Sequence, residues 1–166
     1  MTQTNNKSLH AAYLVALFCW IGAFCFGQVG YGQAAAAKPM TLDKSEAKIE
    51  VLVGDKEQTV ATVQYQGRAD HKAVTAERSF VIGSSDELTK VLKGYGYTSP
   101  TVNFQENLVV HVHSREKQCF QLTVGAILFE EGKVANTVNT EMMRGGSETE
   151  GKLAFTLVIV PRSLTK

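Results

Sequence analysis

The sequence lacks an excess of charge of either sign. It carries 17 lysine and arginine residues against 16 aspartate and glutamate residues, a formal net charge of +1. Proteins that bind nucleic acid draw much of their affinity from cations that neutralise phosphates. Because this chain has no such surplus, we expect neither nucleic acid nor a charged membrane surface to be its partner.

The sequence also lacks an apolar stretch long enough to cross a membrane. The longest apolar run covers residues 11–26, whereas a membrane-spanning helix needs about 20 apolar residues. Lys7 is the one charge before this run, and four alanines follow it at 34–37. This order is typical of a secretory signal peptide cleaved before Lys38, with an uncleaved anchor as the alternative. We expect residues 1–37 to be a signal peptide, the protein to be secreted or periplasmic, and no stable membrane insertion after cleavage.

Cysteine is scarce. Cys19 and Cys25 lie inside the expected signal peptide, so the mature chain keeps Cys119 alone. No intramolecular disulfide can then form, although exported proteins commonly carry them. Stability must come from packing, and the remaining chain is large enough for one ordinary core.

The rest of the chain reads as a polar, flexible segment at 38–48 followed by a single β-rich domain at 49–166. Gly54 and Asp55 separate two alternating segments, which predicts a β-hairpin. Further alternating or apolar runs predict the other strands. The strands are expected at 49–53, 59–65, 108–113, 119–129, 133–140 and 152–160, with a short apolar run at 79–82.

One short helix is expected at about 85–93. Ser84 and Glu87 form a capping-box pattern, and Gly94 suits a left-handed end. Apolar residues recur between them at helical spacing, at Leu88, Val91 and Leu92. The expected fold class is therefore mainly β, an antiparallel sandwich or open barrel with one short helix.

The strands expected at 108–113 and 119–129 suggest a hairpin with chemistry on one face. If their apolar faces match, His113 lies opposite Cys119, and His111 lies two residues along the same face. Two imidazoles and a thiolate are ligands that zinc or copper favours. The sequence thus offers a candidate metal site at His111, His113 and Cys119. A Cys119–His113 nucleophile pair and a simply buried thiol are the competing interpretations.

Two other groups are candidates for binding a protein partner. Tyr95 and Tyr97 lie between glycines in a predicted loop, where they could form a stacking platform or fold back over the core. Met142, Met143 and Arg144 begin a glycine-rich segment and could form an adaptable contact surface or the buried end of a strand.

From Ser79 onward, a short apolar run, a capped helix, the stretch Asn103-Phe104 to Val110 and the ending Val160-Pro161-Arg162 follow one another. This order resembles the PrcB-type C-terminal domain of bacterial exported proteins over roughly residues 79–162. The resemblance implies a non-catalytic, partner-binding β domain, as in an accessory subunit of a protease complex. The segment 114–120 departs from the family's Thr-Gly-Gly-Tyr-like turn, so no binding residues are carried over.

No segment supplies a nucleophile, a base, an orienting residue and an oxyanion hole together. We therefore expect an exported module that is not an enzyme, has no cofactor, and binds and stabilises another envelope or secreted protein. The alternative is a periplasmic metal-binding protein that uses the His111, His113 and Cys119 site.

Overall fold

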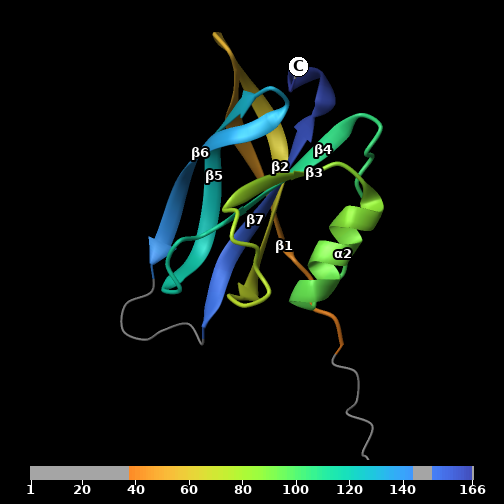
Figure 1. The fold of residues 1–166 in the computed structure, drawn as a ribbon, viewed down its shortest axis with the longest axis vertical. Helices are drawn as coiled ribbons and strands as arrows, with labels where there is room; N and C mark the ends of the chain where they lie inside the picture. Colours follow the sequence, from red (N-terminus) through yellow and green to blue (C-terminus); the bar gives the residue numbers. More distant parts are fainter. Residues whose placement is uncertain (1–37, 144–150, 166) are drawn as a thin grey trace, which may run out of the picture. The chain divides into compact units, whose positions relative to one another are not determined.

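The computed structural model describes residues 38–143 and 151–165, so the expected signal peptide and Arg144 lie outside the described residues. Seven strands and one α-helix make up most of the described chain (Figure 1). The elements are β1 (Asp43–Val53), β2 (Lys56–Asp70), β3 (Ser79–Ile82), α2 (Ser85–Tyr95), β4 (Asn107–His113), β5 (Cys119–Glu130), β6 (Lys133–Met143), β7 (Lys152–Pro161) and a 3-10 turn, η1 (Arg162–Leu164).

The first two strands form the predicted hairpin. β1 and β2 pair from Val53 and Lys56 at the turn to Asp43 and Gln66 at the far end. Gly54 takes the left-handed backbone conformation in the turn, which glycine adopts without strain. The hairpin is longer than predicted. Residues 43–48, expected to be a flexible segment, form the first half of β1 because their backbone pairs with β2, although most of their side chains are exposed.

The strands form one sheet in the order β3-β4-β7-β2-β1-β5-β6, curled into a nearly closed barrel (Figure 1). The mainly β open-barrel expectation with one short helix is confirmed. A strictly antiparallel sheet is wrong in one place, because β1 and β5 run parallel. The strands β3 and β6 are the two edges of the sheet, and Arg78 Nη2 donates to Glu141 Oε1 across them at 2.9 Å.

The sheet buries apolar side chains on both of its faces. On β4, Leu108, Val110 and Val112 point into the barrel, where they join the interior core. Val109 points to the other face, which α2 covers with Leu88 and Leu92. Side chains on successive strand positions alternate between the faces, so the parity predicted for β4 is confirmed. The face opposite the barrel is covered by the helix rather than by solvent.

Helix α2 begins as its sequence predicts and ends slightly later. Ser84 Oγ accepts from Glu87 N at 3.2 Å, which satisfies one of the amides left unpaired at a helix start. The helix ends at Gly96, whose φ of 82° suits the left-handed position, so the predicted end at Gly94 is wrong. Among the described residues, no helix is long and apolar enough to span a bilayer.

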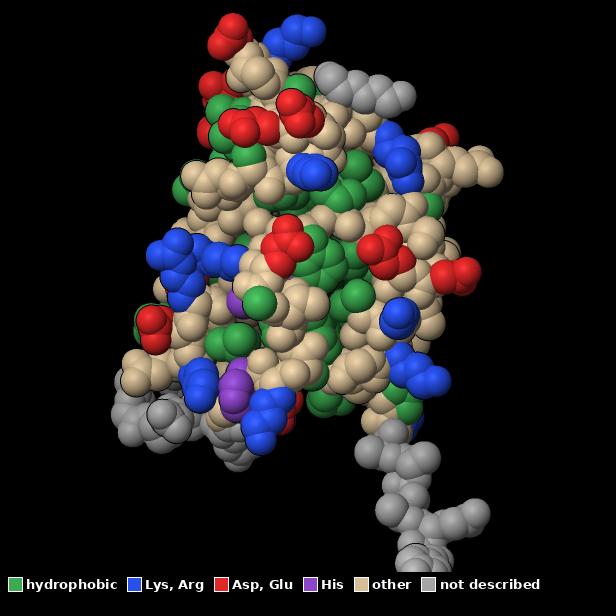
Figure 2. All heavy atoms as spheres, in the orientation of Figure 1, with side chains coloured by type: hydrophobic (Ala, Val, Ile, Leu, Met, Phe, Trp, Pro, Cys, Tyr) green, Lys and Arg blue, Asp and Glu red, His purple; other side chains and the backbone are tan. Residues whose placement is uncertain are grey.

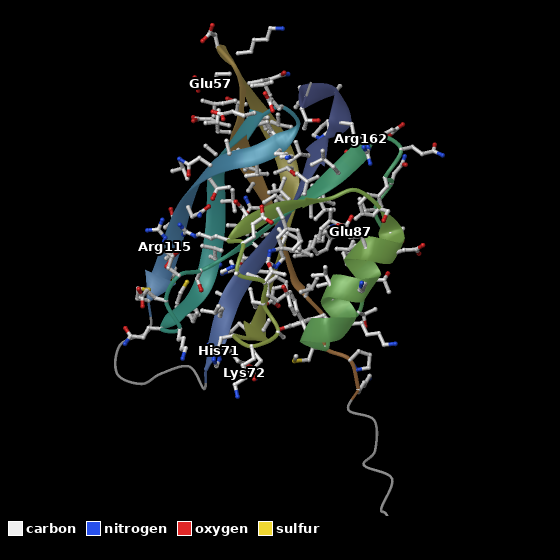
Figure 3. All side chains as sticks on the ribbon, in the orientation of Figure 1. Glu57, His71, Lys72, Glu87, Arg115 and Arg162 are labelled. Carbon is white, nitrogen blue, oxygen red and sulfur yellow. The ribbon has the colours of Figure 1, made fainter. Side chains whose placement is uncertain are left out.

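The end of the chain is held against the start of α2. Arg162 Nη2 donates to the carbonyl of Gly83 at 2.8 Å, while the amide of Gly83 donates to Glu87 Oε2 at 3.0 Å. Arg162 Nε also donates to the carbonyls of Phe104 and Asn107. Figure 3 shows Arg162 and Glu87 on the side of the domain where α2 begins. One guanidinium thus joins β7, the segment before β4 and the helix start.

Candidate functional site

The predicted hairpin of β4 and β5 is wrong. β4 lies between β3 and β7, so that His111 faces Phe80 on one side and Leu157 on the other. β5 lies between β1 and β6. The returning strand β7 occupies the place beside β4 that β5 was expected to take. The pairing that was to bring His111, His113 and Cys119 together is therefore not formed.

The sheet also separates the imidazole of His111 from the thiol of Cys119. His111 lies in the layer between the sheet and α2, where its ring stacks on Phe80 and Phe155 at centroid distances of 4.5 and 5.6 Å. Cys119 belongs to the interior core of the barrel, and its Sγ donates to the carbonyl of Gln121 at 3.1 Å. Within the described residues, no group of three His, Cys, Asp or Glu side chains is placed to hold a metal ion.

The surroundings of His111 favour its neutral form. Its Nε2 lies 3.3 Å from Tyr95 Oη, and its Nδ1 is buried with no hydrogen-bond partner among the described residues. Burial, and then the neighbouring His113, lowers the pKa of His111 to about 3. Burial raises the pKa of Tyr95 to about 12. This pair therefore stays uncharged near neutral pH and acts as a polar contact inside an aromatic layer.

His113 and Cys119 do not form the nucleophile pair. His113 Nδ1 lies 2.9 Å from the carbonyl of its neighbour Ser114, and its ring centre is 6.2 Å from that of His111. Burial, and then the charge of Glu141, raises the pKa of the Cys119 thiol. A protonated thiol is a poor nucleophile and a poor metal ligand. The interpretation of Cys119 as a small buried hydrophobe fits this environment.

Tyr95 and Tyr97 fold back over the core, so the predicted stacking platform is wrong. Tyr95 is buried against Phe155, at a centroid distance of 5.0 Å. Tyr97 Oη accepts from the amide of Arg68 at 2.9 Å and donates to the carbonyl of Arg68 at 3.2 Å. The two rings close the end of the layer between α2 and β2.

Met142 and Met143, by contrast, are exposed, and they have apolar company. Most of the exposed large apolar side chains described lie on the β5–β6 hairpin. They are Phe120, Val138, Met142 and Met143, which we call the hairpin face. Val138 is the most exposed of them at 65%. Sequence reasoning missed Val138 and Phe120, although the uncharged run at 134–140 is a signal that could have identified this strand.

Two stretches of the sheet have a strand on one side only, among the described strands. One is β6, which pairs with β5 alone. The other is the first half of β1, because β5 pairs with β1 only from Glu50 to Val53. A hollow of about 410 Å³ lies at this second stretch, lined by Glu46, Ala47, Lys48, Ala61, Thr62 and Val63.

The charges on the face seen in Figure 2 are interspersed, with acidic side chains between the lysines and arginines. Hydrophobic side chains gather near the middle of this face. The mixture fits the near-zero net charge of the sequence. Comparisons with protein-family models, with curated proteins and with solved structures found no match to this chain.

Proposed function

We propose that this chain is an exported β-rich module, without enzymatic activity, that binds and stabilises another protein in the cell envelope or outside the cell. The order of charged, apolar and small residues at its start supports export. The resemblance to the PrcB-type C-terminal domain supports the partner-binding class. The contact surface that we propose is the hairpin face.

The exposure of Val138, Met142 and Met143 carries this proposal. Large apolar side chains that cluster on a surface commonly mark a protein contact. Methionine side chains are flexible and polarisable, so they adapt to partner surfaces. The hairpin face unites these residues with Phe120 on two adjoining strands, which gives a partner one continuous apolar contact.

The free edge of β6 adds backbone groups to this contact. Edge strands are commonly protected by charged side chains that discourage pairing with another chain. Residues 134–140 carry no charge, and no described strand pairs with the outer edge of β6 along this stretch. A partner segment in extended conformation can therefore add to the sheet here, as in other cases of strand addition.

The non-catalytic part of the proposal is supported by the groups that were candidates for chemistry. Burial lowers the pKa of His111 and raises the pKa of Cys119. Both shifts oppose an imidazolium–thiolate pair, which is the form that activates a cysteine nucleophile.

Site-specific photo-cross-linking tests this proposal. A photoreactive residue is placed at Val138 in the full chain, and a matched control carries it at Lys90, an exposed position on α2. We expect a discrete cross-linked protein from the envelope fraction at Val138 and none at Lys90. Recovery of no partner at Val138, or of the same proteins at both positions, would contradict the proposal.

A further inference from the structure

The first half of β1 is an open strand edge. β1 pairs with β2 along its whole length, but with β5 only from Glu50 onward. Among the described strands, residues 43–49 therefore have a neighbour on one side only. The neighbouring part of β5 instead contacts β2 through the barrel interior, where Gln64 binds both backbone groups of Val124. The outer edge of β1 is left for another chain.

The side chains along this edge alternate in charge. Ile49 and Val51 point into the barrel, so the even-numbered positions of β1 point outward. These positions are exposed and carry Lys44, Glu46, Lys48 and Glu50. Opposite charges directly across an antiparallel pair are stabilising, and like charges are destabilising. The alternation therefore determines in which register a second strand can pair.

A second copy of β1 fits this edge in one register best. When two antiparallel copies meet about Ala47, Glu46 of each copy lies opposite Lys48 of the other. Lys44 and Glu50 then lie opposite each other at the two ends. A shift that centres the pair on Glu46 or Lys48 instead places like charges together. The pattern thus favours its own copy over an uncharged strand, which would leave the lysines unpaired.

The centre of this register also has room for close approach. The hollow of about 410 Å³ is lined by Glu46, Ala47 and Lys48 together with their β2 neighbours Ala61, Thr62 and Val63. The side chain at the centre is the methyl group of alanine, so two strands can meet there without a bulky obstacle.

We propose that two copies of this chain pair through β1, antiparallel and about a two-fold axis at Ala47. The contact is isologous, because the same residues serve both copies. Backbone pairing covers residues 45–49, since β5 occupies the edge from Glu50 onward. Such a short contact buries less surface than a stable dimer of standard size, so dimerisation depends on protein concentration and weakens with salt. This surface is separate from the hairpin face, and the inference does not rest on the proposed function.

Charge exchange in the mature chain tests the register. Sedimentation equilibrium at low ionic strength is expected to show a monomer–dimer equilibrium for the unchanged protein. Glu46→Lys or Lys48→Glu alone places two like-charge pairs at the centre, so we expect the dissociation constant to rise about tenfold or more. The double variant E46K/K48E restores opposite charges and is expected to dimerise as the unchanged protein does.

A mixture of the two single variants gives the sharpest outcome. In a mixed dimer, both central pairs join a lysine of one chain to a glutamate of the other, so the mixture is expected to associate although each variant alone does not. The control variant Lys90→Glu on α2 should dimerise normally. A protein that stays monomeric at every concentration, or single variants that dimerise as the unchanged protein does, would overturn the proposal.

Discussion

The side chain of Gln64 spans the barrel interior and binds both backbone groups of Val124. Gln64 Nε2 donates to the carbonyl of Val124 at 2.7 Å, and the amide of Val124 donates to Gln64 Oε1 at 3.2 Å. A carboxamide offers one acceptor and one donor, as a neighbouring strand would. Gln64 therefore takes the place of a strand where β5 has left the edge of β1. The open edge of β1 is a consequence of this arrangement.

Replacing Gln64 by leucine tests this relationship. Gln64→Leu keeps a similar volume but leaves the buried amide and carbonyl of Val124 unpaired, which costs about 1–3 kcal/mol for each group. We expect the free energy of unfolding, measured with urea, to fall by about 2–5 kcal/mol. Gln66→Leu is the matched control, because Gln66 is only half-buried and contacts another side chain, Gln121. An equal effect of both variants would contradict the assigned role.

The low pKa of His111 predicts that acid destabilises the domain. The pKa is about 3 in the folded protein and about 6.5 in an unfolded chain, so the unfolded state binds the proton more tightly. The stabilisation from neutral His111 is complete above pH 6.5 and is lost as the pH falls from 6.5 toward 3, at about 1.4 kcal/mol per pH unit. His111→Phe keeps an aromatic ring between Phe80 and Phe155 and should reduce this slope in urea unfolding measured from pH 7 to 5. Identical slopes for the two proteins would rule out His111 as the cause.

Arg162 is predicted to stabilise the domain through its planar fork of donors. Arg162→Lys keeps the charge but cannot reach the carbonyls of Gly83, Phe104 and Asn107 together. We expect a loss of about 2–4 kcal/mol in the free energy of unfolding. Arg115→Lys, at an exposed position labelled in Figure 3, should change it by less than about 0.5 kcal/mol. A loss at Arg162 no larger than that at Arg115 would show that the three contacts do not stabilise the domain.

Cys119 is predicted to be inert in the folded protein. Its thiol is buried in the interior core, and burial raises its pKa, so both access and thiolate content are low. A thiol reagent should label the mature chain only slowly in buffer and rapidly in urea. Rapid labelling of the folded protein would place Cys119 outside the core and reopen its use in chemistry.

The face that each side chain of β4 occupies could be predicted from the sequence, but the neighbours of β4 could not. Alternation placed Val110 and His111 on opposite faces, and the structure agrees. Alternation says nothing about which strand lies alongside. The partner of His111 on β7 is Leu157, far along the chain, and no local pattern in residues 107–130 indicates that β7 takes this place.

The candidate site failed for a related reason. Two histidines on a face without other apolar residues suggested a solvated patch, but α2 covers this face and aromatic rings enclose His111. Which face the only described α-helix covers depends on the packing of the whole sheet. The same holds for the hairpin face, because Val138 and Phe120 are exposed through the position of β6 at the sheet edge, which residues 119–143 alone do not specify.

The most direct measurement of the central claim is the affinity of the cross-linked partner, once purified, for three forms of the mature chain. These are the unchanged protein, Val138→Asp on the hairpin face and Lys90→Asp on α2. Both substitutions are at exposed positions, where effects on stability are usually within about 0.5 kcal/mol. We predict that Val138→Asp raises the dissociation constant about tenfold or more and that Lys90→Asp leaves it unchanged. Equal affinity of all three forms would contradict the claim that the hairpin face binds the partner.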